Sequence, residues 1–252
     1  MRVVVPKEIK DGEKRVALVP DVINKLTRLG FDVVIESGAG VHSQAVDAEY
    51  RAAGATISDG EVLSTADAVL SVQPLTPAQM SKLKKGAITI SFLSPVTAVD
   101  SIDAAASAGV TAFSLELVPR ISRAQSMDAL TSQALCAGYR AAVVGAELSP
   151  RFFPMLMTAA GTVTPAQVLV LGAGVAGLQA IATAKRLGGV VSATDVRAAS
   201  KEQVESLGGK FVFVESTKNL ETSGGYAKEL DEDDKKKQEE LLKTTIKNQD
   251  IV

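Results

Sequence analysis

Three glycines in one short segment are spaced as a phosphate-binding turn requires. The apolar run 168–171 leads into Gly172, Gly174 and Gly177, which form a G-x-G-x-x-G pattern ahead of a helical stretch. In such a turn the first glycine makes the tight bend, the second lets the backbone approach a pyrophosphate, and the third lets helix and strand pack closely. The amino end of the helix adds N–H groups and the positive end of its dipole. The pattern predicts dinucleotide binding; an ordinary glycine-rich turn is the alternative.

An acidic residue completes this pattern. Asp195 stands 18 residues after Gly177, at the end of a second expected strand, 190–194. A carboxylate there can accept hydrogen bonds from a ribose 2′-OH and repels a 2′-phosphate, which favours NAD(H). A nearby arginine can instead accept that phosphate, but we interpret Arg197 as a surface or ion-pairing residue. The residues expected to contact the cofactor are Gly172, Ala173, Gly174, Val175, Ala176, Gly177, Asp195, Val196 and Arg197.

Composition limits the class of protein. A length of 252 residues suits two domains, and an apolar content of 46% is enough for buried cores. The formal net charge of −2 does not indicate a nucleic-acid surface. Cys136 and His42 are the only residues of their types, which excludes an internal disulfide framework and a multi-histidine metal site, and we predict no metal. We see no secretory signal or membrane span, and expect a soluble chain without direct membrane insertion.

The first 125 or so residues alternate short apolar strands with amphipathic helices. This alternation predicts an α/β fold, in which a parallel sheet carries helices on its faces. We therefore expect an N-terminal α/β domain over residues 1–128. The expected strands are 3–5, 31–36, 68–72, 87–92 and 110–113, and the expected helices include 21–29 and 47–53.

A long helix, 129–148, is expected to join this domain to a second one. It ends at Ser149-Pro150, and small residues along one face should permit close packing: Ala134, Gly138, Ala141 and Gly145. The second domain, 129–252, would be a Rossmann-like NAD(H)-binding domain. We thus predict two doubly wound, Rossmann-like parallel-sheet domains.

The second domain has fewer strands than its class requires. After 168–171 and 190–194 we expect a third strand at 210–214 and the start of a fourth at 248–252, while the charged run 228–243 reads as a solvated helix face. A doubly wound dinucleotide domain needs about six strands. We therefore expect its C-terminal half to be missing, or to be completed by another chain.

Several stretches resemble one known family. Residues 1–10 and 13–20 are similar to the opening shared by alanine dehydrogenases and the NAD(H)-binding alpha subunit (domain I) of proton-translocating NAD(P) transhydrogenase. More specific is 119–128, which reads Pro-Arg-Ile-Ser-Arg-Ala-Gln-Ser-Met-Asp and resembles the transhydrogenase signature loop. The resemblance covers the whole chain and includes 158–163, 177–188, 193–197 and 201–211.

The resemblance implies an activity and partners. The chain would bind NAD(H) and transfer hydride between NADH and NADP⁺ held on a partner domain, coupled to proton translocation by a membrane domain. It would be a homodimer and a peripheral, soluble chain, at the cytoplasmic face of a bacterial inner membrane or on the mitochondrial matrix side. Gly225 and Tyr226 would belong to a mobile loop that closes over bound nucleotide.

The resemblance also assigns roles in the signature loop. Arg120, Asp128 and Thr131 would orient the nicotinamide carboxamide, and Gln125 would reach towards the ribose of NADP(H). The family usually has serine where this chain has Thr131, which keeps the hydroxyl. A structural alternative is that Ser126 or Asp128 N-caps the long helix while Arg120 pairs with a neighbour.

Two other functions stay open. An alanine-dehydrogenase-like enzyme must move protons as well as hydride and needs a lysine and a histidine near its substrate. The matching stretches, 71–74 and 90–94, contain neither, and we interpret the retained Arg15 as a structural ion-pair residue before a substrate clamp. A non-catalytic NAD-binding or assembly module is the other alternative, because the second domain looks incomplete. Direct transfer between two nicotinamides needs orientation and exclusion of water, but no general acid or base.

Overall fold

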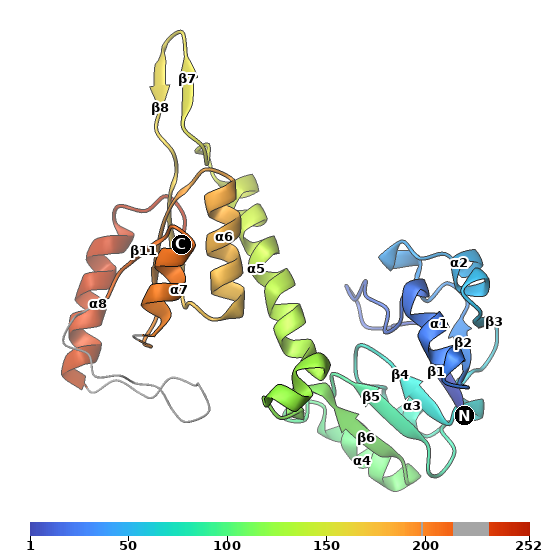
Figure 1. Ribbon diagram of the computed structural model, residues 1–252. Coiled ribbons are helices and arrows are strands. Elements are labelled where there is room, and N and C mark those ends of the chain that lie inside the picture. Colours follow the sequence, from blue (N-terminus) through green and yellow to red (C-terminus); the bar gives the residue numbers. More distant parts are fainter. Residues whose placement is uncertain (198, 214–231) are drawn as a thin grey trace. The chain divides into compact units, whose positions relative to one another are not determined.

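The computed structural model describes residues 1–197, 199–213 and 232–252 (Figure 1). The chain divides into two compact units, Met1–Ala129 and Leu130–Val252. Each unit contains a parallel sheet with helices packed against it. The predicted α/β class with two Rossmann-like sheets is therefore confirmed.

The first unit is built on a six-stranded parallel sheet in the order β3-β2-β1-β4-β5-β6. The chain fills one half from β1 outwards to β3, then returns beside β1 and continues to β6. The order thus reverses between β1 and β4, which is where open α/β sheets form a crevice beyond the strand ends. The strands are β1 Arg2–Val5, β2 Asp32–Glu36, β3 Thr56–Ser58, β4 Ala68–Leu70, β5 Ile88–Ser91 and β6 Thr111–Ser114. The helices are α1 Pro20–Arg28, α2 Asp47–Ala52, α3 Pro77–Met80 and α4 Val99–Ala108, and 3₁₀ turns occur at Val41–Ser43, Leu63–Thr65 and Leu115–Leu117.

Both faces of this sheet are buried. Val4 and Val34 belong to one hydrophobic cluster, whereas Val5, Val33 and Ile35 belong to another on the opposite face. Neighbouring residues of a strand point to opposite faces, so continuous valine runs such as 3–5 suit a sheet covered on both sides. The predicted strands are present within about two residues; β3 was not predicted, because a three-residue edge strand leaves too short a pattern.

The second unit has a three-stranded parallel sheet in the order β11-β10-β9. Ile251 forms a parallel bridge with Val168 on the free side of β9, which agrees with the expected start of a fourth strand. Val214, at the end of the predicted third strand, lies outside the described residues, as do residues 228–231 of the predicted charged helix. The elements are α5 Ala129–Leu148, β7 Leu156–Thr158, β8 Gly161–Val163, β9 Gln167–Leu171, α6 Val175–Arg186, β10 Val190–Thr194, α7 Ser200–Ser206, β11 Lys210–Phe211 and α8 Glu232–Ile246.

The long helix α5 has the predicted bounds and packs closely. Gly138 is buried, and a Cβ atom there would lie 2.0 Å from the carbonyl oxygen of Ala176 on α6. The packed face differs slightly from the prediction. Ala142 and Ala146 pack against the core of the second unit, whereas the predicted Ala141 is exposed. The contact therefore follows the row of residues four apart that starts at Gly138, because such residues lie one above the other on a helix face.

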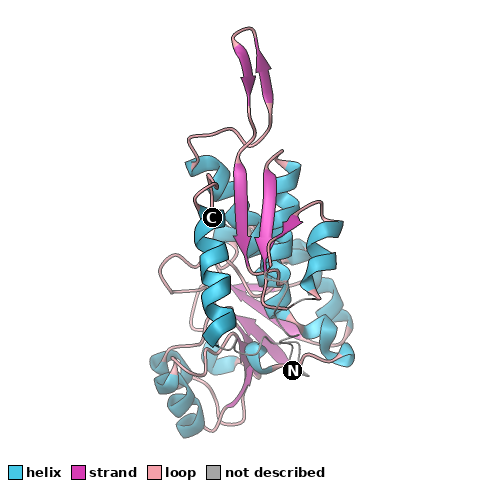
Figure 2. Ribbon diagram, turned by 90° about the vertical axis from the view of Figure 1, so that its left-hand side faces the viewer, coloured by secondary structure: helices cyan, strands magenta, loops and turns pink. Residues whose placement is uncertain are grey.

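The antiparallel hairpin β7–β8 was not predicted, because its strands have three residues each. It extends away from the three-stranded sheet in both views (Figures 1 and 2). Apolar side chains at its base and along it are exposed: Phe152 by 61%, Met155 by 61% and Met157 by 82%. No helix in the part of the chain that the structure describes combines the length and apolar character of a membrane span.

A buried hydroxyl group in the first sheet allows a test of its packing. Thr89 on β5 is 1% exposed, and its Oγ1 has no hydrogen-bond partner. Since an unpaired buried hydroxyl costs about 1–3 kcal/mol, Thr89→Val should raise the free energy of unfolding by about 1 kcal/mol in urea titrations. The control is Thr111→Val on the neighbouring strand, where the exposed side chain should make the change smaller than about 0.5 kcal/mol. A less stable Thr89→Val protein would contradict the lack of a partner.

Candidate functional site

The glycine-rich turn joins β9 to α6, and each glycine has a different physical reason. Gly172 has φ +98°, which favours glycine, and its N–H donates to the carbonyl of Thr194 at 2.8 Å. A Cβ atom on Gly177 would lie 1.8 Å from the carbonyl oxygen of Gly172. A Cβ atom on Gly174 would meet nothing within 4 Å. The first and third glycines therefore shape the turn, while the second borders open space.

The amino end of α6 faces this turn and suits an anion. Gly174 is the N-cap residue, and no side chain caps the helix. The first-turn N–H groups of a helix lack partners within it, and the dipole places partial positive charge there. Val175 is 39% exposed at this end. Ala176 is half-buried because its carbonyl oxygen lies against Gly138. The open space and the helix end together can receive a phosphate group.

Asp195 is held at the edge of the same turn. It follows β10 and is 9% exposed, and its Oδ2 accepts a hydrogen bond from the N–H of Ala173 at 2.7 Å. Its Oδ1 accepts from the backbone N–H of Arg197 at 2.8 Å, and the Arg197 guanidinium contacts both oxygens. Burial raises the pKa of the carboxyl group, but these hydrogen bonds and the arginine charge outweigh it, and the net pKa lies below its ordinary value. The acid therefore stays ionised at neutral pH.

The signature loop lies in the first unit. It contains the 3₁₀ turn Ser122–Met127, followed by Asp128 directly before α5. Buried Ala124 anchors the loop, while Arg120 and Gln125 are exposed and Asp128 is half-buried. The structure brings these three predicted residues together around a depression of about 270 Å³, lined by Pro119, Arg120, Ile121, Ser122, Ala124, Gln125 and Asp128.

The remaining predicted residues are placed as follows. Thr131 is half-buried in the first turn of α5, in the residues of the second unit. Ser126 lies inside the 3₁₀ turn, so that it cannot be the N-cap of α5, whereas Asp128 occupies the position before the helix. Gly225 and Tyr226 lie outside the described residues. The signature loop and the glycine-rich turn thus belong to different units.

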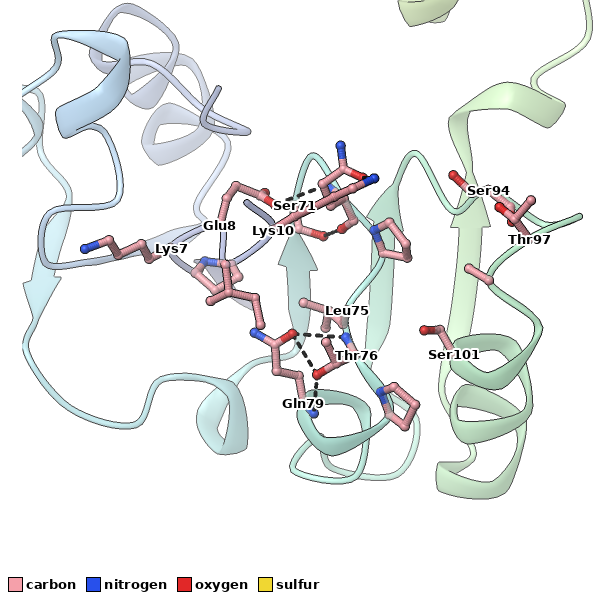
Figure 3. Close-up of a pocket in the computed structure, with 16 residues that line it drawn as sticks. Lys7, Glu8, Lys10, Ser71, Leu75, Thr76, Gln79, Ser94, Thr97 and Ser101 are labelled. Carbon is pink, nitrogen blue, oxygen red and sulfur yellow. Dashed lines mark hydrogen bonds between the residues drawn. The ribbon is translucent and has the colours of Figure 1, made fainter. Parts of the chain in front are cut away.

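Sequence reasoning missed a larger cavity, which lies in the first unit. It has a volume of about 410 Å³ and is lined by residues that follow β1, β4 and β5, beside the point where the strand order reverses (Figure 3). Lys10 Nζ donates to Gln73 Oε1 at 3.2 Å on one side, while Ser94 and Ser101 line the other. The cavity could have been anticipated from the expected strand ends, since ligand sites form at such a reversal.

A charge network next to this cavity occupies Arg15. The Arg15 Nε and Nη2 atoms donate to the two carboxylate oxygens of Glu13 at 2.7 and 2.6 Å. Gln73 Nε2 donates to the same carboxylate at 2.7 Å, and the guanidinium lies 5.9 Å from the centre of the Phe92 ring. Hydrogen bonding from Arg15 outweighs burial and lowers the pKa of Glu13 to about 2. This geometry supports an ion-pair role for Arg15.

Two α/β units, one of which carries a glycine-rich turn, an open helix end and an ionised acid, define a protein of the nucleotide-binding Rossmann class. Models of the alanine dehydrogenase/PNT N-terminal and C-terminal domains match residues 4–137 and 141–252. The chain belongs to this family, and the resemblance seen in the sequence is confirmed.

Individual relatives agree with the family. The chain is 54% identical over 260 residues to an NAD(P) transhydrogenase subunit alpha protein of Rhodospirillum rubrum, covering 98% of this chain and 68% of that one. It is 35% identical over 211 residues to alanine dehydrogenase of Mycobacterium tuberculosis, covering 82% and 56%. The crystal structure of transhydrogenase from Sinorhizobium meliloti superposes with a TM-score of 0.91 at 47% identity, covering 100% and 68%.

The glycine geometry predicts opposite results for two alanine substitutions. Gly177→Ala should lower the free energy of unfolding by more than about 2 kcal/mol, because the turn must move away from the new methyl group. Gly174→Ala should change it by less than about 0.5 kcal/mol, since its backbone is extended and the space is open. Urea unfolding of both variants tests this, and equal losses would contradict the assignment of separate roles.

Proposed function

We propose that this chain is the NAD(H)-binding component of a proton-translocating NAD(P) transhydrogenase. It would transfer hydride between NADH and NADP⁺ held on a partner domain. The observation that carries the proposal is the 54% identity to the Rhodospirillum rubrum transhydrogenase subunit over 98% of this chain. In this proposal residues 1–128 form an N-terminal domain and residues 129–252 form the NAD(H)-binding domain.

The residues of the second unit fit a dinucleotide. The first turn of α6 and the space beside Gly174 would hold the pyrophosphate, and Asp195 would bind the adenosine ribose. When bound, NADH supplies the hydride. The Gly174→Ala variant should then bind NADH more weakly than the unchanged chain, because its methyl group enters the space needed by the phosphates.

The residues of the signature loop support hydride transfer without proton transfer. Arg120, Gln125 and Asp128 offer hydrogen-bonding groups around one depression and would orient the nicotinamide carboxamide and the incoming NADP(H) ribose, together with Thr131. A hydride that passes directly between two nicotinamides needs close, correctly faced carbons and a dry site. The stretches 71–74 and 90–94 contain no lysine or histidine, which argues against amino-acid dehydrogenation.

The partners we propose follow from the same assignment. They are an NADP(H)-binding domain and a proton-conducting membrane domain, with this chain as a peripheral component on the cytoplasmic or matrix side. We also propose a homodimer. The hairpin β7–β8 supports it, because an isolated two-stranded hairpin is marginally stable in water and this one exposes Met155 and Met157.

Substitution of Gln125 tests the proposed activity. In the assembled transhydrogenase, Gln125→Asn should slow hydride transfer from NADH at least about tenfold, or about 1.4 kcal/mol, because the shorter side chain no longer reaches the incoming nucleotide. NADH affinity should stay within about twofold, since the phosphate site lies in the other unit. Gln203→Asn, at an exposed position of α7, is the matched control and should leave both quantities unchanged.

Other outcomes of this experiment distinguish the alternatives. A large loss of NADH affinity in Gln125→Asn would contradict the role given to that side chain. If the unchanged chain binds NADH but gives no transfer with its partner domains, a non-catalytic module is favoured. Reduction of NAD⁺ by alanine would favour the amino-acid dehydrogenase.

Removal of the hairpin tests the homodimer. A short glycine-serine link in place of residues 155–163 should convert the chain to a monomer in sedimentation equilibrium, because the exposed apolar contact is lost. Met157→Ser is a milder variant that should weaken association without removing the strands. A dimer that persists in both variants at the original concentration dependence would contradict this interface.

A further inference from the structure

The carboxylate of Asp195 has no acceptor position left for a ligand. An ionised carboxylate offers about four lone-pair positions on its two oxygens. Oδ1 accepts from the backbone N–H of Arg197 at 2.8 Å and from Arg197 Nε at 2.9 Å. Oδ2 accepts from the backbone N–H of Ala173 at 2.7 Å and from Arg197 Nη2 at 3.0 Å. Donors of the chain itself therefore fill all four positions.

These four donors are of two kinds. The backbone N–H groups of Ala173 and Arg197 fix the carboxylate against the glycine-rich turn and cannot leave without moving the chain. The guanidinium belongs to a side chain that is 24% exposed, whereas the side chain of Asp195 is 7% exposed. A ribose hydroxyl that donates to Asp195 must therefore take a position that the guanidinium holds. The Arg197 side chain is the donor that can move away.

The same pairing hides a cation suited to phosphate. An arginine guanidinium binds a phosphate group through two parallel hydrogen bonds, and an arginine near the ribose accommodates the 2′-phosphate of NADP(H). Here two guanidinium nitrogens, Nε and Nη2, are directed at Asp195 instead. The carboxylate thus repels a 2′-phosphate with its own charge and also occupies the group that would attract one.

We propose that Arg197 is a specificity-determining residue: it competes with the ribose for Asp195, and Asp195 in turn keeps it from binding a 2′-phosphate. The inference rests on the proposed binding of NAD(H) at this turn. It goes beyond repulsion by the acid alone, because it makes selectivity a property of the pair. Loss of the acid should then create an NADP(H) site only while the arginine is present.

A double-mutant cycle on the full chain tests the pair, with NADH and NADPH fluorescence titrations as readouts. Arg197→Ala should bind NADH about threefold more tightly, since the ribose no longer displaces a partly exposed ion pair. Asp195→Ser should bind NADPH at least about tenfold more tightly than the unchanged chain, because two charge-assisted hydrogen bonds become available. The double variant Asp195→Ser/Arg197→Ala should lose this gain, whereas Asp195→Ser/Arg197→Lys should retain part of it.

The outcomes separate the inference from the proposed function. Equal gains in NADPH affinity with and without Arg197 would show that the acid acts alone and would overturn the inference, as would NADH affinity that falls in Arg197→Ala. Failure of the unchanged chain to bind NADH would instead overturn the proposed function. If Asp195→Ser does not fold, judged by circular dichroism, Asp195→Asn replaces it with nearly the same shape. The same comparison of NADPH affinity with and without Arg197 then decides.

Discussion

The second unit depends on the close backbone contact between α6 and the turn before it. Because Gly177 has no side chain, the first turn of α6 lies directly against the carbonyl of Gly172, where a Cβ atom would be only 1.8 Å away. The next layer repeats this solution, since Gly138 of α5 lies against the carbonyl of Ala176. Two helices and the end of β9 are thus held together by contacts that exclude side chains. This packing fixes the helix end beside the space at Gly174, so that structural rigidity and room for a ligand have one cause.

Buried charge is handled in the same way in both units. Asp195 is stabilised by two backbone N–H groups and one arginine, and Glu13 by Arg15 and Gln73. In each case hydrogen bonds outweigh the cost of burial and keep the carboxylate ionised. Such groups orient and select, but they do not exchange protons near neutral pH. This electrostatic character agrees with a function that requires positioning of two nucleotides and no general acid or base.

Most of the fold could be predicted from short-range patterns. Valine runs bounded by glycine and acidic residues gave five of the strands, and the break at Ser149-Pro150 gave the end of α5. The exceptions are β3 and the hairpin β7–β8, whose strands of three residues carry too little periodicity. Their position depends on neighbouring strands, which the local sequence does not specify. The packed face of α5 was displaced from Ala141 to Ala142 for a similar reason, because the surface it meets is formed elsewhere in the chain.

The sequence by itself determined the conformational requirements of the candidate site. The spacing of Gly172, Gly174 and Gly177 specified a turn, and the position of Asp195 specified an acid at the end of the next strand. Only the tertiary structure decided which groups fill the carboxylate, that Arg15 is held by Glu13, and that a cavity forms where the strand order reverses. The physical reason is range: backbone conformation responds to neighbours within a few residues, whereas hydrogen-bond partners and cavities depend on which strands become adjacent.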